Sequence, residues 1–247
     1  MPHTSYSFII LKQVDSTNNY AMAKVHAGMA KHGDAWFTNH QTAGKGQRGK
    51  VWVTGPGDSI ALSIVFLPKH LGTLSPFQLS TAVALGLRDF YSGYAGEATF
   101  IKWPNDIYWN DRKAAGILIE NKYSGKDWKW AVAGIGVNIN QLNFDVHLGN
   151  PVSLKQVTGK TFDTIILARQ LHQKVLQRTA SLLTNPYHLM LAEYNRYLYK
   201  AGQPVKLKKD NMVFETVVQG VSAQGQLLTK DVIEKQFEFG EVEWVIK

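Results

Sequence analysis

The pattern of apolar and polar positions along the chain changes near residue 202. Before it, apolar runs typical of strands alternate with longer segments that have the 3.6-residue period of amphipathic helices. The expected strands cover 8–13, 35–40, 59–67, 99–102, 106–109, 114–120 and 129–140. The expected helices cover 20–30, 75–91, 163–183 and 186–200. These elements predict an α+β fold built on a mixed β-sheet with helices, and we assign it residues 1–200.

After residue 202 the apolar positions alternate over short segments instead. Gly220, Gly225 and Gly240 separate these segments as turns. The pattern predicts a small β-barrel-like domain over residues 201–247. A segment of this size buries little apolar surface by itself, so we expect it to depend on its neighbour for stability.

Composition narrows the chemistry. The chain has 247 residues, is 45% hydrophobic and contains no cysteine, which excludes disulfides, thiolate metal sites and thiol catalysis. Its net charge of +8 favours acidic partners such as nucleotide phosphates, nucleic acid or an acidic protein. We see no signal peptide and no apolar run near the ~20 residues that a membrane span needs. We therefore expect a cytoplasmic protein without a membrane partner.

Cations and carboxylates gather between two apolar strand segments, in Lys102-Trp103-Pro104-Asn105-Asp106 and in residues 111–116 (DRKAAG). Such charges on short strands indicate a site that holds phosphates and a metal ion. The alternative is a hairpin with exposed charges and a proline at its edge. The segment alone leaves both interpretations open.

Residues 44–50 (GKGQRGK) match the dinucleotide fingerprint G-x-G-x-x-G and nearly match a P-loop. Both motifs require a helix immediately after the glycines, and residues 51–56 (VWVTGP) are unsuited to start one. Val51 also replaces the P-loop serine or threonine. What remains is a loop whose amide N–H groups and cations suit an anion, or a basic loop without a ligand.

Two further segments each allow two interpretations. Residues 15–18 (DSTN) either cap the following helix or present hydroxyls and amides to a small polar ligand. In residues 134–140 (GIGVNIN), glycines weaken a strand unless another group approaches closely. Asn138 and Asn140 share one face there, and either could contact adenine or phosphate. A buried strand packed tightly on a helix explains the segment equally well.

Taken in order, these motifs resemble those of biotin protein ligases, also called holocarboxylase synthetases. The resemblance spans 15–18, 41–49 with Trp52, 102–106, 111–118 and 134–140, and extends to an SH3-like C-terminal cap ending near residues 239–242. It implies a catalytic domain of the class II synthetase and lipoate ligase type. It also implies a two-step reaction, in which biotin and ATP form biotinyl-5′-AMP and a lysine of a biotin carboxyl carrier domain then displaces AMP.

The resemblance also implies roles for individual residues. The catalytic residues would be Lys113, Asp106 and Arg48. Biotin would contact Ser16, Thr17, Asn18, Gln41, Gly44, Arg48, Trp52, Lys113 and Gly116. ATP would contact Lys45, Gln47, Arg48, Lys102, Asn105, Asp106, Lys113 and Asn138. Asp106 is the expected Mg²⁺ ligand, and Trp52 would close over the ligand when the loop orders.

The sequence departs from the family pattern in two places. Lys45 and Gln47 stand where the family commonly has arginines, so Gln47 removes a charge that would help retain the adenylate. The chain also starts near the expected catalytic domain, so we expect no DNA-binding winged helix and no specific DNA binding. We expect a monomer or a homodimer. Alternative functions are a lipoate or octanoate ligase or transferase, and a non-enzymatic biotin-sensing nucleic-acid binder.

Overall fold

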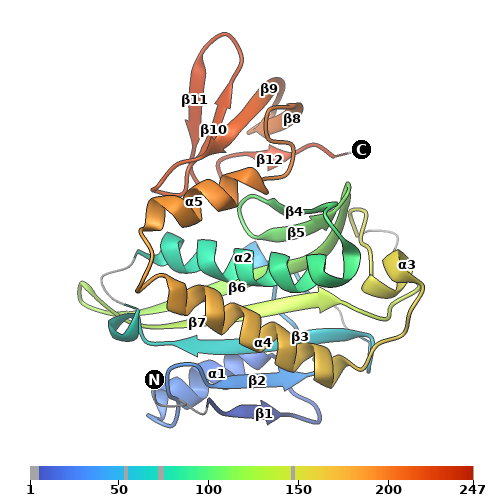
Figure 1. Cartoon of the computed structure of the whole chain (residues 1–247), viewed down its shortest axis with the longest axis vertical. Helices are drawn as coiled ribbons and strands as arrows, with labels where there is room; N and C mark the ends of the chain where they lie inside the picture. Colours follow the sequence, from blue (N-terminus) through green and yellow to red (C-terminus); the bar gives the residue numbers. More distant parts are fainter. Residues whose placement is uncertain (1–5, 53–54, 72–74, 146–147, 247) are drawn as a thin grey trace.

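A seven-stranded mixed sheet forms the centre of the molecule in the computed structural model, which describes residues 6–52, 55–71, 75–145 and 148–246 (Figure 1). Its strands are β1 (Phe8–Ile10), β2 (Ala35–Thr38), β3 (Ser59–Phe66), β4 (Thr99–Lys102), β5 (Asp106–Trp109), β6 (Arg112–Ser124) and β7 (Asp127–Asn138). Their order is β1-β2-β3-β7-β6-β5-β4, and only β1 and β2 pair in parallel. The predicted mixed sheet is confirmed.

The two faces of the sheet are covered differently. Helices α2 (Pro76–Ala95) and α4 (Thr164–Ser181) cover one face, and α1 (Thr17–His26) lies on the other (Figure 1). Side-chain alternation along β3 explains this, because Ile64 and Phe66 enter the large core whereas Val65 joins a smaller cluster with Ala21 and Val25 of α1. Because α1 has only 10 residues, it leaves part of this face of the sheet uncovered, where a site can form.

Helix boundaries follow local chemistry. Ser75 and Gln78 form a capping box at the start of α2, where the sequence predicts a helix from residue 75. Helix α1 begins at Thr17, earlier than predicted, and it ends at His26, two residues before Gly28 with φ +68°. The sequence analysis missed three short elements: α3 (Leu154–Thr158), and the 3₁₀ turns η1 (Gln47–Gly49) and η2 (Pro68–His70).

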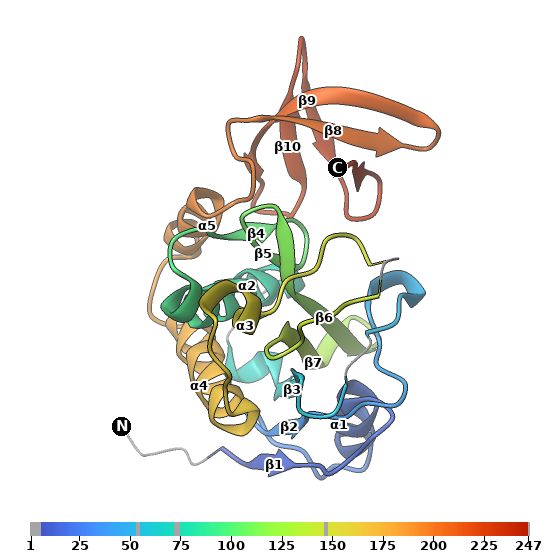
Figure 2. The same cartoon turned by 90° about the vertical axis from the view of Figure 1, so that its right-hand side faces the viewer.

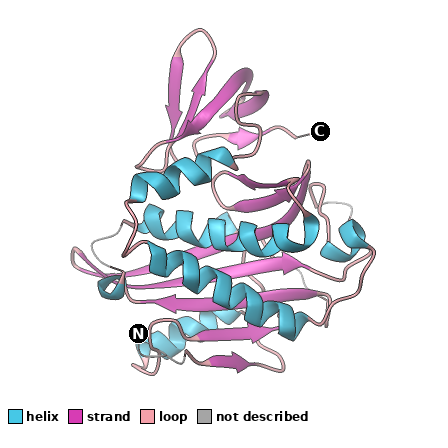
Figure 3. Cartoon of the chain, in the orientation of Figure 1, coloured by secondary structure: helices cyan, strands magenta, loops and turns pink. Residues whose placement is uncertain are grey.

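A second, five-stranded antiparallel sheet follows α5 (Tyr187–Arg196) and contains no helix (Figure 3). Its strands are β8 (Pro204–Lys209), β9 (Met212–Val221), β10 (Leu227–Lys230), β11 (Glu234–Phe237) and β12 (Glu243–Trp244). It lies against the β4–β5 end of the large sheet (Figure 2). Trp103, 1% exposed, donates its indole N–H to the Gly225 carbonyl at 2.9 Å and accepts from Trp244 Nε1 at 3.1 Å. The segment 102–106 therefore lies at the junction of the two sheets.

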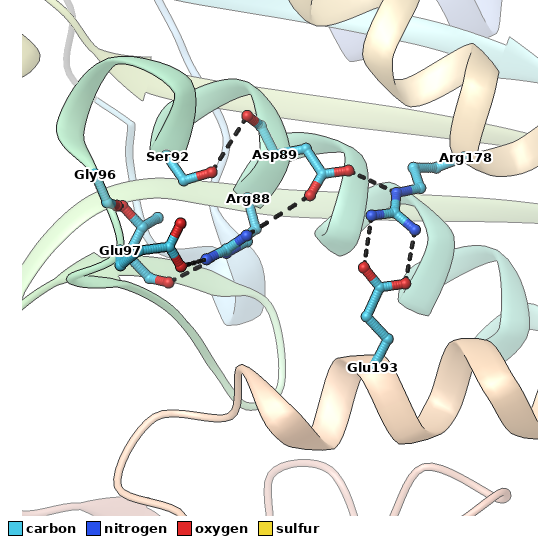
Figure 4. Close-up of polar contacts among 8 residues, drawn as sticks. Arg88, Asp89, Ser92, Gly96, Glu97, Arg178 and Glu193 are labelled. Carbon is cyan, nitrogen blue, oxygen red and sulfur yellow. Dashed lines mark hydrogen bonds and ion pairs between the residues drawn. The ribbon is translucent and has the colours of Figure 1, made fainter.

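Arg178 joins three helices on the side of the large sheet that α2 and α4 cover (Figure 4). From α4 its guanidinium donates to Asp89 of α2 at 2.6 Å and to both carboxylate oxygens of Glu193 of α5, at 2.7 and 2.6 Å. The planar fork of arginine suits this two-sided pairing better than a lysine ammonium does. This ion cluster fixes α5, and with it the entry into the second sheet.

Replacing Arg178 with methionine is expected to lower the free energy of unfolding by about 2 kcal/mol, because Glu193 loses its bidentate partner and Asp89 is left with the longer contact with Arg88 at 3.9 Å. For a chain of this length that corresponds to a fall in Tm of about 4–8 °C, which differential scanning fluorimetry measures. Lys230→Met breaks an exposed pair with Glu234 and should leave Tm within about 1 °C. Equal shifts in both variants would contradict the role of Arg178.

Candidate active site

Three glycines leave a hollow on the α1 face of the large sheet. Gly116 of β6 pairs with Gly136 of β7, and Gly134 lies two residues before Gly136 on the same face. A Cβ atom at Gly134 would lie 2.4 Å from Asn18 Oδ1, and one at Gly136 would lie 2.4 Å from the Trp52 ring. Other groups thus approach the strand glycines closely: the glycines form a floor on which Asn18 of helix α1 and Trp52 lie.

The hollow brings together most of the predicted site residues. It encloses about 480 Å³, a volume that includes space open to solvent. The predicted residues that line it are Ser16, Thr17, Asn18, Gln41, Lys45, Gln47, Trp52, Asn105, Asp106, Lys113 and Gly116. They come from the start of α1, the glycine loop, the turn before β5, and β6.

A polar network holds the start of α1 at this hollow. Gln41 Oε1 accepts from the Thr17 backbone N–H at 2.8 Å, and Asn18 Nδ2 donates to Glu120 Oε2 at 2.8 Å. The buried Ser63 hydroxyl lies 2.6 Å from Asn18 Oδ1. Ser16 occupies the N-cap position without a side-chain cap bond, so capping alone does not account for residues 15–18.

Two polar residues of this network, Ser63 and Glu120, are not among the residues predicted from the sequence. A serine inside the apolar run 59–66 (SIALSIVF) was the available signal, because a buried hydroxyl needs a hydrogen-bond partner. Glu120 carried no comparable signal. Its partner Asn18 is 102 residues away in the sequence.

Lys113 and Asp106 form an ion pair at one end of the hollow. Lys113 Nζ lies 2.7 Å from Asp106 Oδ1, and both side chains are partly shielded from water. Asp106 pairs with Gly116 across β5 and β6, so the carboxylate stands directly beside the glycine floor. Asn105 donates its side-chain N–H to the Ile117 carbonyl at 2.7 Å, which fixes the turn before β5. A cation and a carboxylate are thus held together where ligands would enter.

Two predicted cations lie outside the lining and face the second sheet. The Arg48 guanidinium is 5.8 Å from the Phe239 ring centre. Lys102, 9% exposed, has its ammonium 5.2 Å from the rings of both Tyr108 and Trp244. Burial is the main cause that lowers the pKa of Lys102 to about 8, against the opposing influence of Asp106.

Two more predicted contacts also lie outside the lining. A Cβ atom at Gly44 would lie 2.3 Å from the Trp52 carbonyl oxygen, so this glycine shapes the loop. The buried Asn138 side chain donates to the Lys113 carbonyl at 3.4 Å and so supports the strand that carries Lys113. Asn140, the other candidate, uses its amide to hold the backbone of Gly57 and Phe162. Direct ligand contacts of Gly44 and Asn138 stay predictions.

The glycine loop has neither of the nucleotide motifs that it matches by sequence. Lys45 and Val51 form an isolated antiparallel bridge, and no helix starts between Lys50 and Trp52. Arg48 has φ +56°, a left-handed conformation that turns the loop. The remainder of 51–56 includes positions 53–54, which are outside the described residues. A dinucleotide fold and a P-loop both need that helix, so this loop is neither.

The residues at the hollow can hold a magnesium ion only together with the phosphates of a bound nucleotide. No group of three or more His, Asp or Glu side chains that could hold a metal occurs within the described ranges. Asp106, with Asn105 beside it, supplies one carboxylate at the hollow. Mg²⁺ in nucleotide sites is commonly held by one or two carboxylates together with substrate phosphates, so this donor set is sufficient.

Comparison of the sequence with known proteins places the chain in a family. A model described as the biotin/lipoate A/B protein ligase family matches residues 10–138, more than half of the chain. The chain belongs to this family. A biotin–[acetyl-CoA-carboxylase] ligase of Paracoccus denitrificans is 30% identical over 234 residues, covering 92% of this chain and 95% of that protein. The bifunctional ligase/repressor BirA of Escherichia coli is 28% identical and covers 96% of this chain and 73% of its own length.

Solved structures of family members share the fold. A biotin protein ligase from Aquifex aeolicus in complex with biotin and ATP superposes with a TM-score of 0.81 at 22% identity, covering 98% of this chain and 99% of that one. One from Leishmania major in complex with biotinyl-5-AMP gives a TM-score of 0.67 at 19% identity, covering 94% and 98%. This likeness extends over both sheets. No helix in the described parts of the chain is long and apolar enough to cross a membrane.

Proposed function

We propose that this ligase joins biotin to a lysine of a carrier protein in two ATP-dependent steps. In the first, a biotin carboxylate oxygen attacks the α-phosphorus of ATP, and the bond to pyrophosphate breaks. In the second, the neutral lysine amine attacks the carbonyl of biotinyl-5′-AMP, and AMP leaves. The observation that carries the proposal is the Lys113–Asp106 pair at the glycine floor of a family member's hollow.

Lys113 serves the first step. The reaction brings two anions together, so a cation between them lowers the barrier by offsetting their repulsion. The Lys113 ammonium lies 2.7 Å from the Asp106 carboxylate, and we assign to it the contact with the biotin carboxylate and the α-phosphate when substrates bind. Mg²⁺ held by Asp106 and the phosphates would neutralise further charge on the triphosphate.

The opposite end of the hollow suits the biotin ring. Ser16, Thr17 and Gln41 present hydrogen-bonding groups there. Gly116 lies between the two ends, since a Cβ atom there would be 3.3 Å from Asp106 Oδ1, and its backbone also lines the hollow. Trp52 lies on the floor beside Gly136, where its ring can exclude water from the anhydride. Its indole N–H is buried without a hydrogen-bond partner among the described residues, so a ligand acceptor would satisfy it.

We further propose that the acceptor is the biotin carboxyl carrier domain of a biotin-dependent carboxylase, and that the enzyme acts in the cytoplasm as a monomer or homodimer. The name of the Paracoccus denitrificans relative supports the acceptor class. The net charge of +8 favours an acidic partner surface.

AMP production tests the proposal directly. The chain is incubated with biotin, ATP and Mg²⁺, with and without an apo carrier domain, and AMP and pyrophosphate are quantified. Without the carrier domain we expect release of pyrophosphate, limited to about one molecule per enzyme molecule if the adenylate is retained. Once the carrier domain is present, we expect continuous release of AMP. Turnover with lipoate or octanoate but not with biotin would assign the chain to the lipoate branch of its family.

Gln47 offers a second measurement. It lines the hollow but carries no charge, so Gln47→Arg is expected to slow the loss of biotinyl-5′-AMP from the enzyme by about fivefold to twentyfold through a charge-assisted contact with the phosphate. Release of labelled adenylate after rapid gel filtration measures this rate. Gln47→Met is the matched control and should leave retention near the wild-type value. Faster release from the arginine variant would contradict the proposed proximity to the phosphate.

Lys102 predicts the alkaline limb of the pH profile. With the pKa of Lys102 near 8, the free enzyme loses this charge above about pH 8 and keeps it below. If the charge assists ATP binding, kcat/KM for ATP should fall about tenfold per pH unit above that value. Lys102→Arg stays protonated and should flatten this limb at whatever activity it retains. A wild-type profile that is flat to pH 9.5 would exclude the role.

A further inference from the structure

The second sheet provides an aromatic contact for each of two cations that the resemblance assigns to ATP. Arg48 lies over Phe239, and Lys102 lies between Tyr108 and Trp244. Phe239 and Trp244 both belong to the second sheet or its connecting turn. The charges of Lys50 and Lys113 also lower the pKa of Lys102, although burial is the main cause of the lowering.

The Arg48 contact is shaped by the turn at residues 238–241. Gly240 has φ +84°, and a Cβ atom there would lie 2.4 Å from Arg48 Nη2, so the guanidinium rests directly on the turn. Phe239 in turn packs edge-on against Trp103, with ring centres 6.5 Å apart, although it is 51% exposed. Burial in a core therefore does not explain the position of this ring.

The carboxylates near this contact are engaged elsewhere. Glu241 accepts the Glu238 backbone N–H at 3.0 Å and pairs with Lys209, and Glu238 accepts from Gln226 at 2.7 Å. Arg48 forms no ion pair within the part of the chain that the structure describes. A π face attracts a guanidinium while leaving its in-plane N–H groups available to an anion. An ion pair with a carboxylate would have used those groups.

We infer that Phe239 is a positioning residue for ATP: it holds Arg48, which directly follows the lining residue Gln47, so that the guanidinium can meet the polyphosphate. This rests on the proposed biotin and ATP activity and adds a part of the second sheet to the ATP subsite. Phe239 itself need not touch the nucleotide. Its effect passes through Arg48.

Substitutions at Phe239 distinguish the contribution of the aromatic π face from that of an apolar side chain of similar size. Phe239→Leu keeps an apolar side chain without a π face and should raise KM for ATP about threefold to fivefold, from the usual strength of an exposed cation–π contact. KM for biotin and Tm should change little, because the ring is half exposed. Phe239→Tyr restores the π face and should rescue most of the loss. Val232→Ala, 94% exposed in the turn between β10 and β11, is the control outside the contact.

A double-mutant cycle with Arg48→Ala tests the coupling. If Phe239 acts through Arg48, Phe239→Leu should not raise KM for ATP further in the Arg48→Ala background. Multiplicative effects of the two substitutions, or an unchanged KM for ATP in Phe239→Leu, would overturn the inference while leaving the ligase activity intact. Absence of biotin-dependent pyrophosphate release in the wild type would instead reject the proposed function itself.

Discussion

Replacing Lys113 with alanine is expected to reduce biotinyl-5′-AMP formation by about 10³-fold, the largest effect of any single substitution considered. Its ammonium lies 2.7 Å from the Asp106 carboxylate beside the glycine floor, the place that we propose for the meeting of the biotin carboxylate and the α-phosphate. Without it, two anions approach next to a third negative charge, that of Asp106. Biotin-dependent pyrophosphate release in a coupled assay measures the loss.

Two further variants locate this effect in the chemistry. Lys122→Ala removes an exposed lysine farther along β6 and should retain full activity. Lys113→Arg keeps the charge but changes its geometry, so partial activity is expected. Lys113→Ala should keep a Tm close to the wild-type value, since the lysine is one-third exposed and packs in no core. Pyrophosphate release near the wild-type rate in Lys113→Ala would refute the assigned role.

Local signals in the sequence were sufficient to predict the longer helices and the positions of the strands along the chain, but not α3 or the order of the strands within the sheet. The box formed by Ser75 and Gln78, followed by a long apolar period, predicted α2 from neighbouring residues alone. Strand ends were less predictable, because they depend on distant partners. The predicted strand 129–140 ends at Asn138, since the Asn140 side chain is held by the backbone of Gly57 and Phe162.

The same contrast between local signals and distant contacts holds for the candidate site. The ordered motifs predicted most of the lining of the hollow, because the residues within each motif are neighbours along the chain. They did not predict which cations face the ligand cavity and which face the second sheet. That depends on contacts such as the one between Lys102 and Trp244, which are separated by most of the chain length. Ser63 and Glu120 were missed for the same reason, since both act through Asn18 of α1.

Replacing Asp106 with alanine is expected to impair both adenylate formation and transfer to the carrier. Lys113, in contrast, is assigned to adenylate formation. Adenylation falls because Lys113 loses the partner that holds its ammonium at the floor. Transfer falls by about 10²-fold or more, the usual contribution of a general base, because the acceptor lysine must lose a proton before it attacks. Single-turnover transfer from preformed biotinyl-5′-AMP to an apo carrier domain measures the second step without the first.

The pH dependence of this transfer distinguishes a base from a structural residue. An unassisted lysine has a pKa of about 10.4, so transfer in Asp106→Ala should rise about tenfold per pH unit toward that value. The wild type should change less over the same range, because Asp106 accepts the proton. Asp127→Ala, which removes a fully exposed carboxylate at the β7 end of the hairpin, should behave as the wild type. If Asp106→Ala transfers biotin at the wild-type rate, the carboxylate acts only in adenylation, and the acceptor lysine must lose its proton to another group or to water.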